Sequence, residues 1–200
     1  MPNLDILLKM SLYVALVLVM PGPTNTLLLS SGLKVGLRGT WPLLIAEALG
    51  YFVGIAAWGF FLSALAVGRP WLPVAVKLVS AAYILWLAVK MWGTSRALHD
   101  VPGGPVTFRD LFVTTLLNPK ALLFASTLFP LEAFQSIRYF VMTIAAFWIV
   151  LIPVGIGWSS LGGLLMARRR WARHTSTLLR GASVVLVAFS GSLLYSVLNR

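Results

Sequence analysis

Two long apolar stretches of the sequence are each interrupted by proline. The first carries no charge from residue 10 to residue 33, and Pro-Gly-Pro-Thr-Asn interrupts it at residues 21–25. The second lies between residues 110 and 132, and Leu-Asn-Pro-Lys interrupts it at residues 117–120. An unpaired backbone amide in hydrocarbon costs several kcal/mol, so such breaks need partners in protein or water. Matching breaks in the two halves of a membrane chain indicate discontinuous helices that face a polar path.

Apolar residues dominate the whole chain and not one segment of it. The 200 residues are 59% hydrophobic and 10% charged, whereas soluble domains average about 45–50% apolar and about 25% charged residues. This composition predicts a membrane protein with several spans. Cysteine is absent, which excludes disulfides and thiolate metal sites.

The net charge of +11 does not indicate a nucleic-acid partner, because the basic residues form no groove with interleaved aromatics. Five arginines instead cluster between two apolar stretches, as in a cytoplasmic loop: Arg168, Arg169, Arg170, Arg173 and Arg180. The sequence has no nucleophile–base set, phosphate loop or metal cluster. We therefore expect no cofactor, no metal site and no enzymatic activity.

A membrane-spanning helix needs roughly 20 mostly apolar residues, and the sequence contains six such segments. We expect an all-α polytopic fold with spans at 4–20 (with a second limb at 24–33), 40–67, 74–92, 110–129, 139–166 and 178–198. A loop is predicted at 34–39. Pro153 and the glycines that follow it predict a kink in the fifth span.

The six spans divide into two sets of three, and each set has a break in its first helix. A repeat with an odd number of spans must insert with opposite orientation, so the two sets are predicted to form a 3+3 inverted repeat. Residues 1–92 would form the first repeat, 93–109 the connecting loop and 110–200 the second repeat. Together they would make a single transmembrane domain.

Basic residues near the span ends indicate the orientation. The loops after spans one, three and five carry Lys34, Arg38, Lys90, Arg96, Arg109 and the five clustered arginines. The opposite side carries fewer: Lys9, Arg69, Lys77, Arg138 and Arg200. We therefore expect both termini outside the cytoplasm.

The second break has the sequence of a helix start inside the membrane. Asparagine is a favoured N-cap, and proline is favoured at the first helical position. Pro119 is therefore predicted to begin a half-helix with Lys120 in its first turn. That helix end carries about half a positive charge, so a lysine there requires something negative to offset it. Pro23, Thr24 and Asn25 would begin a second half-helix in the same way.

Glu47 is the only acidic residue in the interior of a predicted span. A charge at the membrane centre costs about 2.5–3.5 kcal/mol on translocon scales, so Glu47 and Lys120 should face a cavity or a partner. Tyr51 lies one turn on and on the same face. Protonation would remove most of the cost of burying Glu47, which suits a proton-coupled carboxylate. Gly50 and Gly54 are interpreted as helix-packing positions.

Two other interpretations stay open from the residues alone. Both prolines could be tolerated kinks, with Lys120 reaching the interface or structurally paired. Glu47 and Lys120 could also form an ion pair that only holds helices together.

The two breaks also carry a family resemblance. The segment from Pro21 to Leu28, with the glycines at 32, 36 and 39, resembles the first helix of the LysE/RhtB family of translocators. The segment from Leu117 to Ala121, followed by Phe124 and Phe129-Pro130, is similar to that family's second signature. The resemblance extends over nearly the whole chain. It implies export of amino acids and their derivatives from bacterial cells, driven by the proton gradient, and hence a multi-pass protein of the bacterial inner membrane.

Carried over residue by residue, the resemblance marks both breaks as part of the transport path. With the acid and tyrosine described above, the predicted substrate and ion path comprises Pro21, Gly22, Pro23, Thr24, Asn25, Glu47, Tyr51, Asn118, Pro119 and Lys120. The chain departs from many relatives in one respect. They carry an acidic residue at the position of Tyr51, whereas here the acid lies one turn earlier.

The combined prediction is an amino-acid exporter that works by proton antiport and alternating access. The half-helix starts and Lys120 would hold the substrate carboxylate, and Glu47 would alternate between a proton and the substrate ammonium. Its partners would be the small-molecule substrate, protons and membrane lipid, and the glycine faces permit a homo-oligomer. The alternatives are a cation or metal exporter, for which one carboxylate and no cysteine make a poor site, and a non-transporting scaffold or assembly protein.

Overall fold

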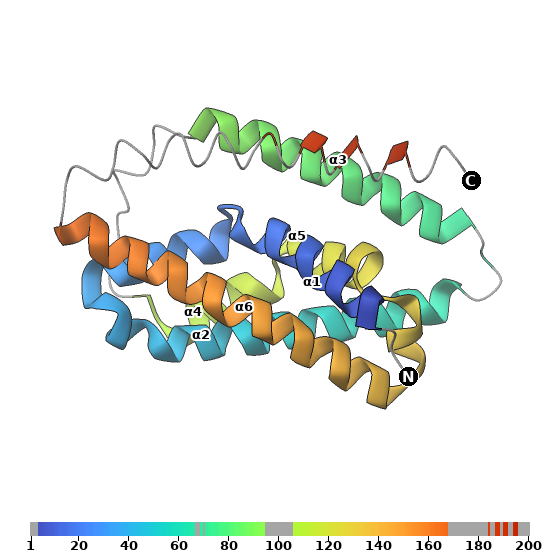
Figure 1. Ribbon diagram of the computed structural model, residues 1–200, viewed down its shortest axis with the longest axis horizontal. Helices are drawn as coiled ribbons and strands as arrows, with labels where there is room; N and C mark the ends of the chain where they lie inside the picture. Colours follow the sequence, from blue (N-terminus) through green and yellow to red (C-terminus); the bar gives the residue numbers. More distant parts are fainter. Residues whose placement is uncertain are drawn as a thin grey trace.

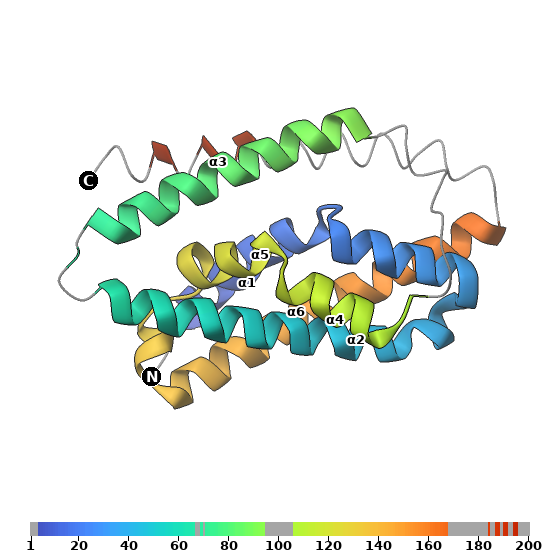
Figure 2. The ribbon, with the colours of Figure 1, turned by 180° about the vertical axis from the view of Figure 1, so that it is seen from behind.

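The structure is a computed structural model that describes residues 4–66, 69, 71–94, 106–167, 184, 187–188, 190–191 and 194–195. These residues form helices and connecting segments, with no β-strand among them. Figures 1 and 2 show the helices elongated along a common axis, with α3 (Trp71–Thr94) along one side of the bundle that the others form. The arginine cluster, most of the predicted connecting loop and most of the sixth predicted span lie outside the described residues.

The first break separates α1 (Leu4–Val19) from α2 (Pro23–Ala66). The prediction of a loop at 34–39 is wrong, because α2 is helical there except at Gly36. This glycine has φ 68° and ψ 177°, a conformation that L side chains rarely adopt. The chain therefore folds back at a single residue (Figure 1), and the Thr40 hydroxyl donates to the Gly36 carbonyl at 2.8 Å. We call the segment before Gly36 the short limb of α2 and the segment after it the long limb.

The second half of the chain has a similar order of elements. It begins with α4 (Phe108–Leu116), and a break follows, then α5 (Pro119–Leu123) and the π-helix η1 (Phe124–Leu128). A short 3-10 helix, η2 (Leu131–Gln135), leads into the long helix α6 (Ile137–Ala167). A kink was predicted at Pro153. In the structure this proline lies inside α6, and all residues of α6 are helical.

Two of these helices are long and apolar enough to cross a membrane, Pro23–Leu65 and Ile137–Leu164. A third candidate is the pair Phe108–Leu116 and Pro119–Leu128, which bends by 45° at the second break. The described residues thus support an all-helical membrane protein. The count of six spans and the inverted repeat stay predictions.

Helix α2 packs most extensively on α6 and α4, and glycines let these helices approach closely. A Cβ at Gly32 would collide with the Ser159 backbone, and one at Gly162 with the Leu29 carbonyl. A Cβ at Gly50 would lie 2.9 Å from the Phe112 carbonyl oxygen. The interpretation of Gly50 as a packing position is therefore confirmed.

The largest apolar core lies between α1, the long limb of α2, η1 and α6. At its centre Tyr51, Phe124 and Phe147 contact one another edge to face, with ring centroids 5.1–5.6 Å apart. Such aromatic pairs contribute about 0.5–1.5 kcal/mol beyond their buried area. This core holds Tyr51, and with it the long limb of α2, against the second break.

Candidate functional site

The second break is a capped helix start, as the sequence predicts. The side-chain oxygen of Asn118 accepts a hydrogen bond from the backbone N–H of Lys120 at 3.0 Å, and Pro119 occupies the start of α5. The amide nitrogen of Asn118 donates to the Tyr51 hydroxyl at 3.2 Å. This side chain therefore caps α5 and also ties it to the long limb of α2.

The first break is built differently from the second. Helix α2 begins at Pro23, as predicted, but Asn25 is not its N-cap. The Asn25 amide nitrogen turns back to α1 and donates to the carbonyls of Leu18 at 2.7 Å and Met20 at 2.6 Å. The last carbonyls of a helix have no partner within it, so Asn25 supplies one for the end of α1.

Lys120 joins the two breaks. Its ammonium donates to the carbonyls of Val17 at 3.0 Å and Met20 at 2.9 Å, and only 1% of the side chain is exposed. Gly22 gives it room, since a Cβ there would lie 3.2 Å from the ammonium nitrogen. The negative partner that Lys120 was expected to need is therefore the carbonyl end of α1, which carries about half a negative charge.

Glu47 is also buried, with 1% of the residue exposed. It lies next to Thr24 at the level of the first break, and one carboxylate oxygen would lie 3.2 Å from a Cβ at Gly155 of α6. Lys120 is near enough to attract it electrostatically. Among the described residues no direct ion pair joins Glu47 to Lys120, whose ammonium contacts the carbonyls of α1 instead.

The structure thus brings most of the predicted path residues together, but not all in the same way. Glu47, Tyr51, Thr24, Asn25, Asn118 and Lys120 are buried, whereas Pro21 and Gly22 are half-buried. Pro23 and Pro119 are exposed on the outside of the bundle. These two prolines begin helices, and their polar neighbours turn inward.

Three buried hydroxyl oxygens make no hydrogen bond of standard geometry to another described residue: Thr24, Ser30 and Ser159. The Thr24 hydroxyl is still close enough to interact with the Glu47 carboxylate. Thr24 and Ser30 are on the short limb of α2, and Ser159 is on α6. Thr24 lies beside Glu47, and Ser159 packs against Gly32. Buried polar groups are usually paired with protein or water. These hydroxyls therefore indicate where water or a polar solute would bind.

Sequence reasoning missed two parts of this site. The carbonyls at the end of α1 were not considered, although a helix that ends in hydrocarbon must pair its last carbonyls. The Tyr51–Asn118 contact joins residues far apart in the chain, and no local pattern marks it.

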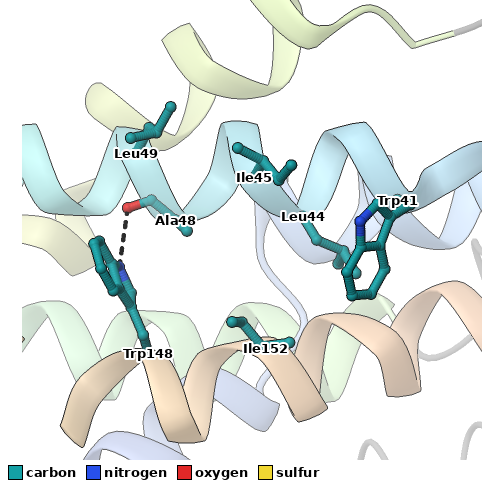
Figure 3. A pocket seen from close by; sticks show the side chains of 7 residues that line it. All are labelled: Trp41, Leu44, Ile45, Ala48, Leu49, Trp148 and Ile152. Atoms are coloured by element: carbon teal, nitrogen blue, oxygen red, sulfur yellow. Dashed lines mark hydrogen bonds between the residues drawn. The ribbon is translucent and has the colours of Figure 1, made fainter. Parts of the chain in front are cut away.

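A surface groove of about 230 Å³ lies between α2 and α6 (Figure 3). Apolar side chains line it, among them those of Trp41 and Trp148. The Trp148 ring nitrogen donates to the Ala48 carbonyl at 3.3 Å. Nothing polar in its lining could recognise a charged solute. Among the described residues no group of three or more His, Asp or Glu side chains could hold a metal ion.

Comparison with known proteins shows the family of this chain. Residues 15–197 match the family model described as LysE type translocator. A cysteine/O-acetylserine efflux protein of Salmonella paratyphi A is 33% identical over 115 residues, which are 58% of this chain and 59% of the relative. One of Escherichia coli K12 is 31% identical over 118 residues, with the same shares. The chain thus spans less than two thirds of these relatives, and no solved structure matches it. Because the family model covers most of the chain, this protein belongs to the LysE type translocator family.

Proposed function

We propose that this protein exports a small amino acid or amino-acid derivative from the bacterial cytoplasm by proton antiport. The observation that carries the proposal is the junction of two broken helices around a buried acid, a buried base and buried hydroxyls. The efflux of cysteine and O-acetylserine by the named relatives supports a small polar substrate.

Glu47 is the proposed proton carrier. It follows Gly36 by about three helical turns, or roughly 16 Å at 1.5 Å per residue, which is about half of a hydrocarbon core of about 30 Å. A carboxylate at that depth is stable when protonated or when paired with an ammonium. Glu47 would therefore release its proton when the substrate ammonium binds and take up another when the substrate leaves.

Lys120 and the start of α5 are the proposed partners of the substrate carboxylate. In this structure the Lys120 ammonium is held by the carbonyls of Val17 and Met20. A carboxylate that enters the junction would compete with these neutral carbonyls for the same ammonium. Substrate binding would then loosen the contact between α1 and α5, which links recognition to movement.

Alternating access between two three-helix repeats is the proposed movement. The short limb of α2 runs parallel to α6, since Leu28 lies at Gly155 and Gly32 at Ser159. In the same way α4 and α5 run parallel to the long limb of α2, with Gly50 at Thr115 and Gly54 at Ala121. The broken segment of each half thus packs along the long helix of the other half. This reciprocal packing supports an inverted repeat whose halves rock about the junction.

The membrane potential would supply part of the driving force. One elementary charge that crosses the membrane is worth about 2.3 kcal/mol per 100 mV. The proposed location is the inner membrane with both termini outside the cytoplasm, as the basic loops indicate.

The test is transport in everted vesicles that carry the wild type, Glu47→Gln or Glu132→Gln. Glu132 is exposed beside Pro130, so its substitution is a matched control for the same chemical change. We expect cysteine or O-acetylserine uptake that depends on the pH gradient with the wild type and with Glu132→Gln, and none with Glu47→Gln. Proton-coupled uptake by Glu47→Gln would remove Glu47 from the mechanism, and no uptake of any amino acid by the wild type would contradict export.

A further inference from the structure

The C-terminal end of α1 presents three backbone carbonyls to the interior of the bundle. Asn25 donates to those of Leu18 and Met20, and Lys120 donates to those of Val17 and Met20. The end of a helix carries about half a negative charge on such carbonyls. Unwound backbone carbonyls and half-helix C-terminal ends are also the ligands with which membrane transporters coordinate Na⁺. The end of α1 therefore has the ligands and the charge that a monovalent cation requires.

We propose that the carbonyl end of α1 is a cation-binding site whose resident cation is the ammonium of Lys120. This cation is part of the protein itself, because Lys120 belongs to α5 in the other half of the chain. It would take the place of an inorganic ion and hold α1 against α5 in this conformation.

The surroundings of the ammonium support a site shaped for a cation. Two of its three N–H groups are used by the Val17 and Met20 carbonyls. At Gly22 a Cβ would lie 3.2 Å from the ammonium nitrogen and 3.3 Å from the neighbouring carbon of Lys120, so the backbone closes directly around the charge. The charged group that faces it is Glu47 on α2, and Glu47 makes no ion pair with it among the described residues. Neutral carbonyls and the helix end, rather than a carboxylate, hold this cation.

This arrangement has a consequence for variants that lack the lysine. Without the ammonium, the carbonyls of Val17 and Met20 lose buried hydrogen bonds in a place that water reaches poorly. A side chain that also leaves the volume empty would let a free cation enter and restore those contacts. A side chain of similar volume without charge would leave the Val17 carbonyl unpaired, since Met20 keeps its hydrogen bond from Asn25, and would block the free cation.

The experiment measures thermal unfolding of the purified full-length protein in lipid nanodiscs by tryptophan fluorescence. Chloride salts of choline, sodium, potassium and methylammonium are compared at equal ionic strength. The wild type should unfold at the same temperature in all four. Lys120→Ala should unfold at least about 5 °C lower in choline, with saturable recovery in sodium, potassium or methylammonium. Lys120→Met should show the loss without the recovery.

Either of two results would overturn the site. One is a Lys120→Ala protein that responds to none of the three cations, and the other is a Lys120→Met protein as stable as the wild type. If Lys120→Ala does not survive purification in choline, the yield of folded protein in each salt is the readout, and no yield in any salt counts against the site. The measurement needs no transport, so failure of the cation site and failure of the proposed export are distinguishable.

Discussion

The two motif asparagines provide a test of the junction, because the same substitution should have opposite outcomes at them. The Asn25 amide nitrogen is the donor, to the carbonyls of Leu18 and Met20. Asn118 acts as an acceptor at the start of α5, and its contact with Tyr51 can reverse because a hydroxyl can donate as well as accept. Asn→Asp keeps the shape of the side chain and removes its N–H donors.

The structure sets the expected size of each effect. Each lost hydrogen bond at Asn25 contributes about 0.5–1.5 kcal/mol, and the new carboxylate would lie at about 2.7 Å from carbonyl oxygens that repel it. Asn25→Asp should therefore lower the free energy of unfolding by roughly 2–4 kcal/mol. Asp is as good an N-cap as Asn and is favoured at the positive end of a helix. Asn118→Asp should therefore stay within about 1 kcal/mol of the wild type.

Thermal unfolding in nanodiscs provides the assay. For a chain of this length about 1 kcal/mol corresponds to roughly 2–4 °C, so Asn25→Asp should unfold roughly 5–15 °C below the wild type and Asn118→Asp within about 4 °C of it. Equal losses at the two positions, or the larger loss at Asn118, would refute the assignment of donor and acceptor roles.

Two further predictions concern packing and the Tyr51 contact. Gly162→Ala on α6 should lower the unfolding temperature strongly, because its Cβ would collide with the Leu29 carbonyl, whereas Gly157→Ala on the same helix has nothing within 4 Å and should be neutral or slightly stabilising; similar temperatures for the two variants would contradict the close packing. Tyr51→Phe keeps the ring contacts with Phe124 and Phe147 but removes the acceptor for Asn118, so it should cost about 0.5–1.5 kcal/mol in unfolding measurements. The exposed Tyr195→Phe is its control, and an equal effect of the two would show that the hydroxyl contact is not formed.

The local features of the breaks could be predicted from sequence because they follow from backbone chemistry. Asn-Pro favours a helix start, and the structure confirms one at Pro119. The loop at 34–39 was wrong for a related reason. Polar and glycine residues there suggested a loop, but in this structure one glycine of positive φ completes the turn and the flanking residues stay helical.

The partners of the polar side chains could not be predicted, because they depend on tertiary contacts. Lys120 was expected to need an anion, and no pattern in the sequence indicates that the carbonyls of Val17 and Met20 lie beside it. Asn118 precedes Pro119 and caps the helix after its break, whereas Asn25 follows Pro23 and pairs with the helix before its break. The order of asparagine and proline in each motif does not show that Asn25 pairs with the carbonyls of α1.

The asymmetry bears on how the halves can move. The first break leaves the carbonyls of α1 to be paired by Asn25 from its own half and by Lys120 from the other half. A motion that separated the halves at this point would expose at least the Val17 carbonyl to hydrocarbon without a partner, at a cost of several kcal/mol. The junction must therefore act as the pivot of any rocking motion, or exchange Lys120 for another cation during it.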